Sequence, residues 1–220
     1  MIRRNAVKPQ GGIGLRALKR VLAIGAHPDD IELGCLGYLM KLAKDAHIRA
    51  YVASLGSIGD PTTGPHRRKE SQKALAVLNC EELRFRGKAG IEMSDFDEIH
   101  EELYDMIQSF QPDLILCLGP HDSHQEHRYI YELMMTGARR LHSSIMTYGI
   151  VSNTLDFQPR IFVDISDQYL EKKKALQFFT SQKDRYYMQD DFLDIFHTHK
   201  YPILHGLTFC ESFQCERIFL

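Results

Sequence analysis

Residues 26–32 place one imidazole and three carboxylates on a single turn of the chain: His27, Asp29, Asp30 and Glu32. The apolar run 21–25 before them predicts a buried strand, and the periodic apolar residues after them predict a helix. Aspartates often cap helices, so a capped turn and a metal site explain this motif equally well when it is taken alone. However, carboxylates this close together repel one another unless a cation lies among them. The turn therefore predicts a divalent metal site, most simply for zinc.

A second group of polar side chains follows the later apolar run 113–119. His124 and His127 are three residues apart at the expected start of a helix, so they can share one face of it. His121 and Asp122 come just before them. In doubly wound sheets, ligands bind outside the carboxyl ends of the strands, where the strand order reverses. A strand order of 3-2-1-4-5 would make strands one and four neighbours, and the two clusters would then meet.

The metal-type residues divide into ligands and reacting groups. Catalytic zinc typically takes three protein ligands and keeps one position open. His27, Asp30 and His127 form such a two-histidine, one-carboxylate set. Asp29 is then free to act as a base toward an attacking water, and His124 is expected to face the substrate. Asp122 is expected to orient His124 and keep it charged, although a plain turn aspartate is an equal alternative.

Strands and helices alternate from residue 21 onward, which predicts an α/β fold with a mostly parallel sheet and helices on both faces. The expected strands are 21–25, 48–55, 83–85, 113–119, 145–151, 160–165, 207–213 and 217–220. The expected helices are 31–46, 67–78, 95–110, 126–141, 167–179 and about 184–196. Lys172, Lys173 and Lys174 predict a solvated helix face, and the Tyr186–Tyr187 pair is interpreted as core.

Composition narrows the class of protein. The formal charge of −2 over 220 residues gives no field that favours nucleic acid. Five scattered cysteines without a C-x-x-C pair argue against a disulfide framework and against a cysteine zinc site. No apolar run is long enough for membrane insertion, and the basic N-terminus lacks the apolar core of a signal peptide. We expect a cytoplasmic protein with a flexible arm at 1–18 and a single domain at 19–220.

Several motifs together resemble the PIG-L/LmbE family of zinc-dependent N-deacetylases. The first is His27-Pro28-Asp29-Asp30 with Glu32, and the second is Asp122-x-His124-x-x-His127-Arg128. Arg67-x-x-Glu70, the segment 162–166, Ser181-Gln182 and Glu211-Ser212-Phe213 also match. The resemblance covers roughly residues 20–215.

The resemblance implies a Rossmann-like three-layer fold with a metal site at the C-terminal ends of strands 1 and 4. It also implies removal of an N-acetyl group from an N-acetylglucosamine-type sugar or sugar conjugate, giving a free amine and acetate. The ligands of Zn²⁺, or of another divalent metal, would be His27, Asp30 and His127. Asp29 would be the general base, and a protonated His124 would stabilise the oxyanion or protonate the leaving amine.

Substrate recognition is less well defined than the catalytic core. Arg67, Arg68 and Asp122 are the candidate substrate-binding residues, although Arg67 and Arg68 equally suit a solvated helix start. Where the family often has an aspartate after strand three, this chain has Arg86-Gly87-Lys88. An amidase acting on a thiol conjugate or another N-acyl compound, and a catalytically inactive metal-binding module, remain as alternatives. A homo-oligomer is left open, and so are the roles of His197, His199 and His205.

Overall fold

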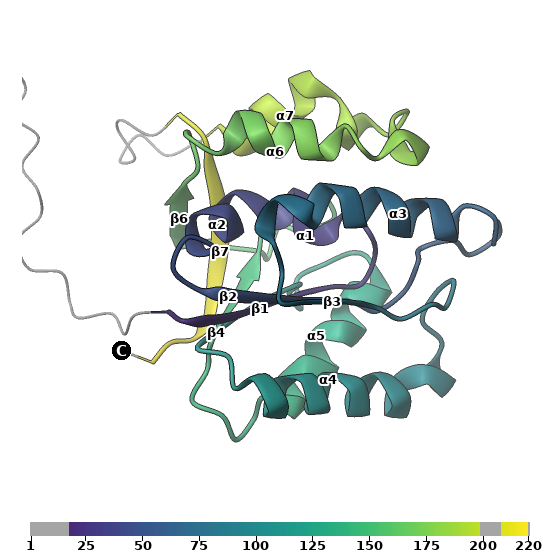
Figure 1. The fold of residues 1–220 in the computed structure, drawn as a ribbon, viewed down its shortest axis with the longest axis vertical. Coiled ribbons are helices and arrows are strands. Elements are labelled where there is room, and N and C mark those ends of the chain that lie inside the picture. The colour runs from purple at the N-terminus through teal and green to yellow at the C-terminus, as the bar shows by residue number, and fades with distance from the viewer. Residues whose placement is uncertain (1–17, 199–207, 220) are drawn as a thin grey trace, which may run out of the picture.

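The computed structural model describes residues 18–198 and 208–219. Its strands form one sheet in the order β3-β2-β1-β4-β5-β7-β6 (Figure 1). The strands are β1 (Arg20–Gly25), β2 (His47–Val52), β3 (Glu82–Phe85), β4 (Leu114–Cys117), β5 (Ser144–Tyr148), β6 (Ile161–Asp164) and β7 (Cys210–Arg217). The first five strands are parallel, and β7 runs antiparallel to both β5 and β6. The predicted order 3-2-1-4-5, with β1 beside β4, is confirmed.

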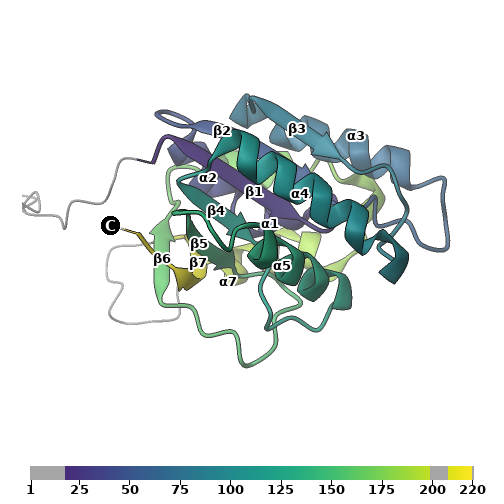
Figure 2. The same cartoon turned by 90° about the horizontal axis from the view of Figure 1, so that it is seen from below.

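Helices cover both faces of this sheet, which confirms the predicted three-layer α/β fold. They are α1 (Asp30–Gly34), α2 (Leu36–Leu42), α3 (Gly64–Leu75), α4 (Phe96–Phe110), α5 (Gln125–Gly137), α6 (Tyr169–Leu176) and α7 (Asp190–His197). Helices α1, α2 and α3 lie on one face, with α6 packed against them, and α4 and α5 lie side by side on the other face (Figures 1 and 2). None of the described helices has the length and apolar character needed to cross a bilayer.

The central strands are apolar because both of their faces are covered. Residues 21–24 of β1 and 115–117 of β4 have no exposed surface, as a parallel sheet between two helical layers requires. Helix α4 buries Ile99, Leu103, Met106, Ile107 and Phe110, whose spacing of three and four residues forms one apolar stripe toward the sheet. The rigid centre of the sheet thus fixes where the loops after β1 and β4 begin.

The predicted helix 31–46 is broken at Cys35, which separates α1 from α2. The carboxylate of Glu211 accepts hydrogen bonds from the amides of Gly37 and Tyr38, each at 2.7 Å, at the start of α2. The ammonium of Lys172 donates to the Leu33 carbonyl at 2.7 Å and to Glu211 at 2.6 Å. A buried ion pair therefore satisfies the backbone groups that the break exposes. The prediction that Lys172 lies on a solvated face is wrong, because its side chain is fully buried.

The end of the chain also differs from the prediction. One strand, β7, runs through Cys210–Arg217 where the sequence suggested separate strands at 207–213 and 217–220. Pairing with β5 carries β7 from Phe213 to Arg217, with a shift of register between Ile145 and Met146. Residues 207 and 220 lie outside the described residues, as does all of the predicted 1–18 arm except Leu18.

Candidate metal and catalytic site

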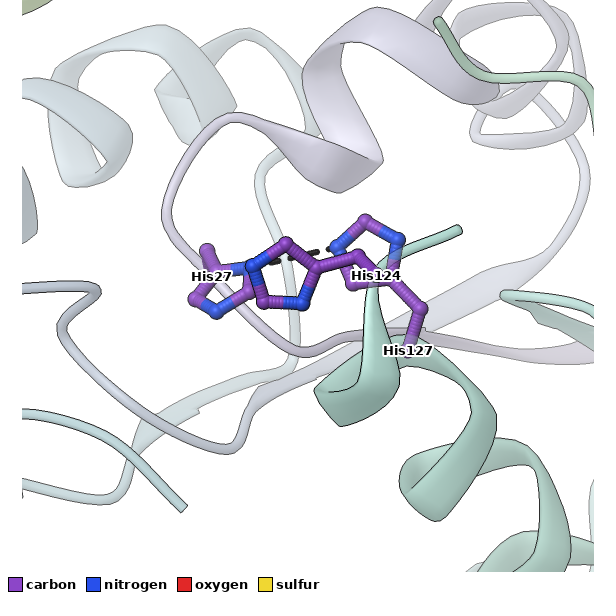
Figure 3. Close-up of side chains that lie close together, drawn as sticks. All are labelled: His27, His124 and His127. Carbon is purple, nitrogen blue, oxygen red and sulfur yellow. Dashed lines mark hydrogen bonds between the residues drawn. The ribbon is translucent and has the colours of Figure 1, made fainter. Parts of the chain in front are cut away.

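The loops after β1 and β4 meet at the carboxyl edge of the sheet, as the two sequence clusters predict. The rings of His27, His124 and His127 gather there, with the two later histidines at the start of α5 (Figure 3). Each of these three residues offers a ligand atom, and the three atoms lie within 4.8 Å of one another. The rings border a cavity of about 720 Å³ that also contains Asp29, Asp30 and Arg67.

The turn after β1 is held in an unusual shape by Asp30. Its Oδ2 atom accepts hydrogen bonds from the amides of Ala26 at 2.9 Å and His27 at 2.8 Å. Within this turn Asp29 has φ = 115°, a value that side chains rarely allow. Such backbone strain costs on the order of 1–3 kcal/mol and persists only where the surroundings impose it. The strained residue is the predicted base, which is consistent with a turn built to present that carboxylate.

Two imidazole nitrogens and the two carboxylate oxygens of Asp30 lie close together at the cavity. The Nδ1 atom of His27 lies 3.2 Å from Nε2 of His127 and 3.6 Å from Oδ2 of Asp30. The other oxygen of Asp30, Oδ1, lies 3.5 Å from the same His127 nitrogen. Zinc bonds of about 2.0–2.1 Å in a tetrahedral site separate neighbouring ligand atoms by roughly 3.3 Å. The distances between these side chains are therefore of the size that a shared metal ion requires.

The outer nitrogen of each facing imidazole is bonded to a carboxylate. His27 Nε2 lies 2.8 Å from Glu126 Oε2, and His127 Nδ1 lies 2.9 Å from Asp122 Oδ2. When His27 Nε2 and His127 Nδ1 carry the protons, the lone pairs of His27 Nδ1 and His127 Nε2 are free and lie close together. Metal-ligating histidines have this arrangement. Each candidate ligand ring thus has a carboxylate that orients it.

The pKa shifts of His27 and Asp30 indicate that the space between their side chains favours a cation. Burial alone lowers its pKa, but the hydrogen bonds with Asp30 and Glu126 outweigh burial and raise the pKa to about 10. For Asp30, burial favours the neutral acid, yet the two neighbouring histidines hold the pKa of this carboxyl well below its usual range. The donors therefore stabilise a cation between them, and a divalent metal suits the site.

Arg67 contacts the predicted base and not open solvent. Its guanidinium donates to Asp29 Oδ1 at 3.1 Å, to the Pro28 carbonyl at 2.8 Å and to the Gly56 carbonyl at 2.5 Å. Burial raises the pKa of Asp29 to about 6, although Arg67 opposes the shift. Gly56 has φ = 59°, and a Cβ there would lie 2.3 Å from an Arg67 nitrogen, so glycine allows this close approach. Arg67 lines the cavity, but its polar contacts fix the turn.

The other two predicted substrate-binding residues lie apart from the cavity lining. Arg68 is exposed, and its guanidinium stacks 5.5 Å from the centre of the Phe85 ring. Asp122 is buried behind His127, and its Oδ1 accepts a hydrogen bond from the His124 backbone amide at 2.8 Å. The side chain that Asp122 orients is that of His127, in contrast to the expected contact with the His124 imidazole.

His124 lies at the rim, where its ring stacks on that of His127 with centroids 4.6 Å apart. Burial, followed by the charges of His27 and His127, lowers its pKa. These surroundings favour the neutral imidazole over the charged form implied by the family resemblance. A neutral ring still carries one N–H donor and one acceptor nitrogen.

Sequence reasoning missed most of the cavity's far wall, which comes from η3 (Thr180–Gln182) and η4 (Tyr186–Met188). Gln182, Arg185 and Tyr187 line the cavity there. Tyr187 packs against the hydrophobic core, as predicted, and it also borders the cavity. Burial together with the charge of Asp29 raises the pKa of Tyr187 to about 12. The core prediction is wrong for Tyr186, which is 62% exposed.

Glu126 was also missed, although its place inside the H-x-x-H motif could have indicated a contact with one of the ligands. Of the late histidines, His197 is buried and faces the Cys210 carbonyl, away from the cavity lining. His199 and His205 lie outside the described residues.

Comparison with known proteins places these motifs in a family. Residues 22–138 match the PIG-L family model, described as GlcNAc-PI de-N-acetylase. The chain is 34% identical over 165 residues to the "Uncharacterized deacetylase YaiS" of Escherichia coli K12, covering 71% of this chain and 88% of the relative.

Solved structures with the same fold include two of different activities. An N,N'-diacetylchitobiose deacetylase from Pyrococcus horikoshii aligns with a TM-score of 0.74 and 22% identity, covering 91% of this chain and 84% of that one. GalB, the 4-carboxy-2-hydroxymuconate hydratase of Pseudomonas putida KT2440, aligns with a TM-score of 0.75 and 15% identity, covering 92% and 98%. The sequence matches, unlike the fold alone, identify this chain as a member of the PIG-L (GlcNAc-PI de-N-acetylase) family.

Proposed function

We propose that this protein is a zinc-dependent hydrolase that removes an N-acetyl group from an N-acetylglucosamine-type sugar or sugar conjugate. The observation that carries the proposal is the convergence of His27 Nδ1, Asp30 Oδ1 and His127 Nε2 beside the carboxylate of Asp29. The family description and YaiS both name deacetylation. GalB is a hydratase with the same fold, so the fold contributes nothing to the choice of reaction.

The residues that would hold the metal are His27, Asp30 and His127, with Glu126 and Asp122 orienting the two rings. A bound zinc, or another divalent ion, polarises a carbonyl oxygen and makes water a stronger nucleophile at neutral pH. His124 offers a further nitrogen near the same point, so a three-histidine set is the alternative ligand arrangement.

Asp29 is the proposed base, because its carboxylate borders the cavity and Arg67 fixes one of its oxygens. It takes the proton of the attacking water as the C–O bond forms. His124, at the rim, donates a hydrogen bond from its N–H to the oxygen that becomes negative. One well-placed donor of this kind is typically worth about 3 kcal/mol of barrier. Asp29 then returns the proton to the nitrogen as the C–N bond breaks, which gives acetate and the free amine.

Other N-acyl compounds, including acylated thiol conjugates, are the runner-up substrates within the same chemistry. The 720 Å³ cavity is large enough for a sugar, and its lining of Ser123, Ser152 and Gln182 offers neutral polar groups to hydroxyls.

Zinc-loaded protein incubated with N-acetylglucosamine derivatives and other N-acyl compounds tests the proposal by the release of acetate and amine. The Asp29→Asn variant should lower kcat by about 10²–10⁴-fold, the usual loss for a general base. Arg140→Gln, on the exposed stretch after α5, serves as the matched surface control. Equal rates for wild type and Asp29→Asn on every substrate would contradict the enzymatic proposal.

A further inference from the structure

The charged groups that line the cavity are unequally paired. Three carboxylates line it, from Asp29, Asp30 and Glu126, and each contacts a cationic or imidazole partner. Three guanidinium groups line it as well, but only Arg67 forms an ion pair with a carboxylate among the described residues. Arg128 and Arg185 are left without an acidic partner in the part of the chain that the structure describes.

Arg128 belongs to the wall formed by α5. One of its terminal nitrogens donates to the Asp122 carbonyl at 2.6 Å, so a neutral acceptor fixes one end of the guanidinium. The side chain is only half-buried and borders the cavity, which leaves its remaining donors available.

Arg185 belongs to the opposite stretch of chain, between η3 and η4. Its amide donates to the Gln182 carbonyl at 2.9 Å, and its own carbonyl accepts from the Met188 amide at 3.0 Å. The Glu70 carboxylate in turn accepts hydrogen bonds from the Thr180 hydroxyl at 2.8 Å and the Ser181 amide at 2.9 Å. The backbone that carries Arg185 is thus fixed to α3. Arg185 is exposed, and it lines the cavity together with Gln182 and Tyr187.

The positive and negative groups of the lining are therefore separated. All three carboxylates are engaged with the histidines or Arg67, whereas Arg128 and Arg185 have no carboxylate partner among the described residues. Arginine stays charged at any physiological pH, and its planar fork matches carboxylate and phosphate oxygens. Unpaired charges of one sign raise the local concentration of ligands of the opposite sign.

We propose that the cavity selects N-acyl substrates that carry an anionic group, a carboxylate or a phosphate, which Arg185 and Arg128 contact. The proposal rests on the deacetylase function proposed above, and it names the class of substrate within it. Neutral sugars bind the same pocket without this contact and are the weaker substrates.

Matched pairs of ligands test the inference. N-acetylglucosamine is compared with its 1-phosphate and 6-phosphate, which carry the phosphate arm, and with N-acetylmuramic acid, which carries the carboxylate arm. Dissociation constants are measured by titration calorimetry with zinc-loaded Asp29→Asn protein, in which turnover is suppressed, and kcat/KM is measured with the wild type. At least one anionic ligand should bind about tenfold more tightly than the neutral sugar, and that preference should shrink as salt screens it.

Variants of the two arginines assign the effect. Arg185→Gln and Arg128→Gln should each reduce the ratio of the affinity for the anionic ligand to the affinity for N-acetylglucosamine several-fold. Arg185→Lys should restore part of the preference, and Arg140→Gln should change nothing.

Equal binding of neutral and anionic ligands, or a preference that survives both arginine substitutions, would overturn the inference while leaving deacetylation intact. Anion-selective binding without acetate release from any substrate would instead reject the proposed function and keep the charge selectivity.

Discussion

Two buried glutamates near helix α1, Glu211 and Glu32, differ in whether a cationic side chain neutralises them. Glu211 lies at the break between α1 and α2, where the ammonium of Lys172 and two backbone amides satisfy its oxygens. Glu32 lies inside α1, three residues after Asp29, and its partners are the Ser71 hydroxyl and the Asp29 amide at 3.3 Å. Both carboxyls are almost fully buried, at 1% and 0% exposure, but only Glu211 has a cationic partner.

The difference separates structural charge from functional charge. Burial raises the pKa of Glu32 to about 8, with further repulsion from Asp29 and Asp30. On this side of α1 the chain gathers acidic groups that a cation would stabilise, whereas at the break it compensates its own charges. Proteins retain such locally unfavourable arrangements mainly at functional sites.

The largest expected effect on stability comes from breaking the buried ion pair of Lys172 and Glu211. Glu211→Gln should lower the free energy of unfolding by about 3–5 kcal/mol, because Lys172 is left as an unpaired buried charge. Urea unfolding at pH 7, followed by circular dichroism, measures the loss.

Replacing both partners distinguishes charge from packing. The double variant Lys172→Met/Glu211→Gln should recover much of the lost stability, since no buried charge then remains. If the double variant is less stable than Glu211→Gln, hydrogen bonding at the helix break and not the unpaired ammonium explains the loss.

The second effect concerns zinc binding at the site of His27, Asp30 and His127. Zinc at one hundred times its dissociation constant should raise the free energy of unfolding of the wild type by about 2.7 kcal/mol. The His127→Ala variant should lose most of this stabilisation and most of its bound zinc, measured by thermal unfolding and metal analysis. His142→Ala, outside the cavity lining, should behave like the wild type. Equal zinc stabilisation of His127→Ala would remove that residue from the ligand set.

The sequence predicts the active side of α1 better than the structural side. The alternation of elements predicts the parallel sheet, and the strand order considered for it, 3-2-1-4-5, is the one that brings His27 and His127 together. The site could be predicted because histidines and aspartates directly after buried strands indicate a metal or catalytic site without knowledge of distant contacts.

The remaining features depend on contacts between residues far apart in the chain. Gly34 and Gly37 weaken the helix on either side of Cys35, but they do not by themselves predict a break. The carboxylate that caps α2 comes from Glu211, more than 170 residues later. Lys172 looks like its neighbours Lys173 and Lys174 until that partner is known. The sequence does not show that Arg67 contacts the turn at Pro28 and Asp29, or that Asp122 contacts the His127 ring. Both residues were therefore predicted to bind substrate.

The free energy of unfolding of the metal-free protein should depend on pH through the buried carboxyl of Glu32. Its pKa of about 8 lies above the ordinary value of 4.5, so the stability that its protonated form contributes is complete below pH 4.5. That contribution is lost as the pH rises through 8. Glu32→Gln keeps a neutral group at every pH. Its free energy of unfolding relative to the wild type should therefore increase by about 1.4 kcal/mol or more from pH 5 to pH 8, as measured by urea unfolding. Parallel profiles of the two proteins would mean that Glu32 is not strained.

The smallest expected effect is at Glu70, a third buried carboxylate that is satisfied by neutral donors alone. It accepts hydrogen bonds from Thr180 and from both the amide and the hydroxyl of Ser181, so it attaches the wall that carries Arg185 to α3. Glu70→Ala should raise KM about three- to tenfold, the equivalent of one lost hydrogen bond, because this wall loses its anchor. The turnover number kcat should stay within twofold, since the contact between Arg67 and Asp29 does not involve this carboxylate. Steady-state kinetics measure both constants, with the exposed Glu101→Ala as control. A fall in kcat at unchanged KM would show that Glu70 acts on the catalytic turn and not on the wall.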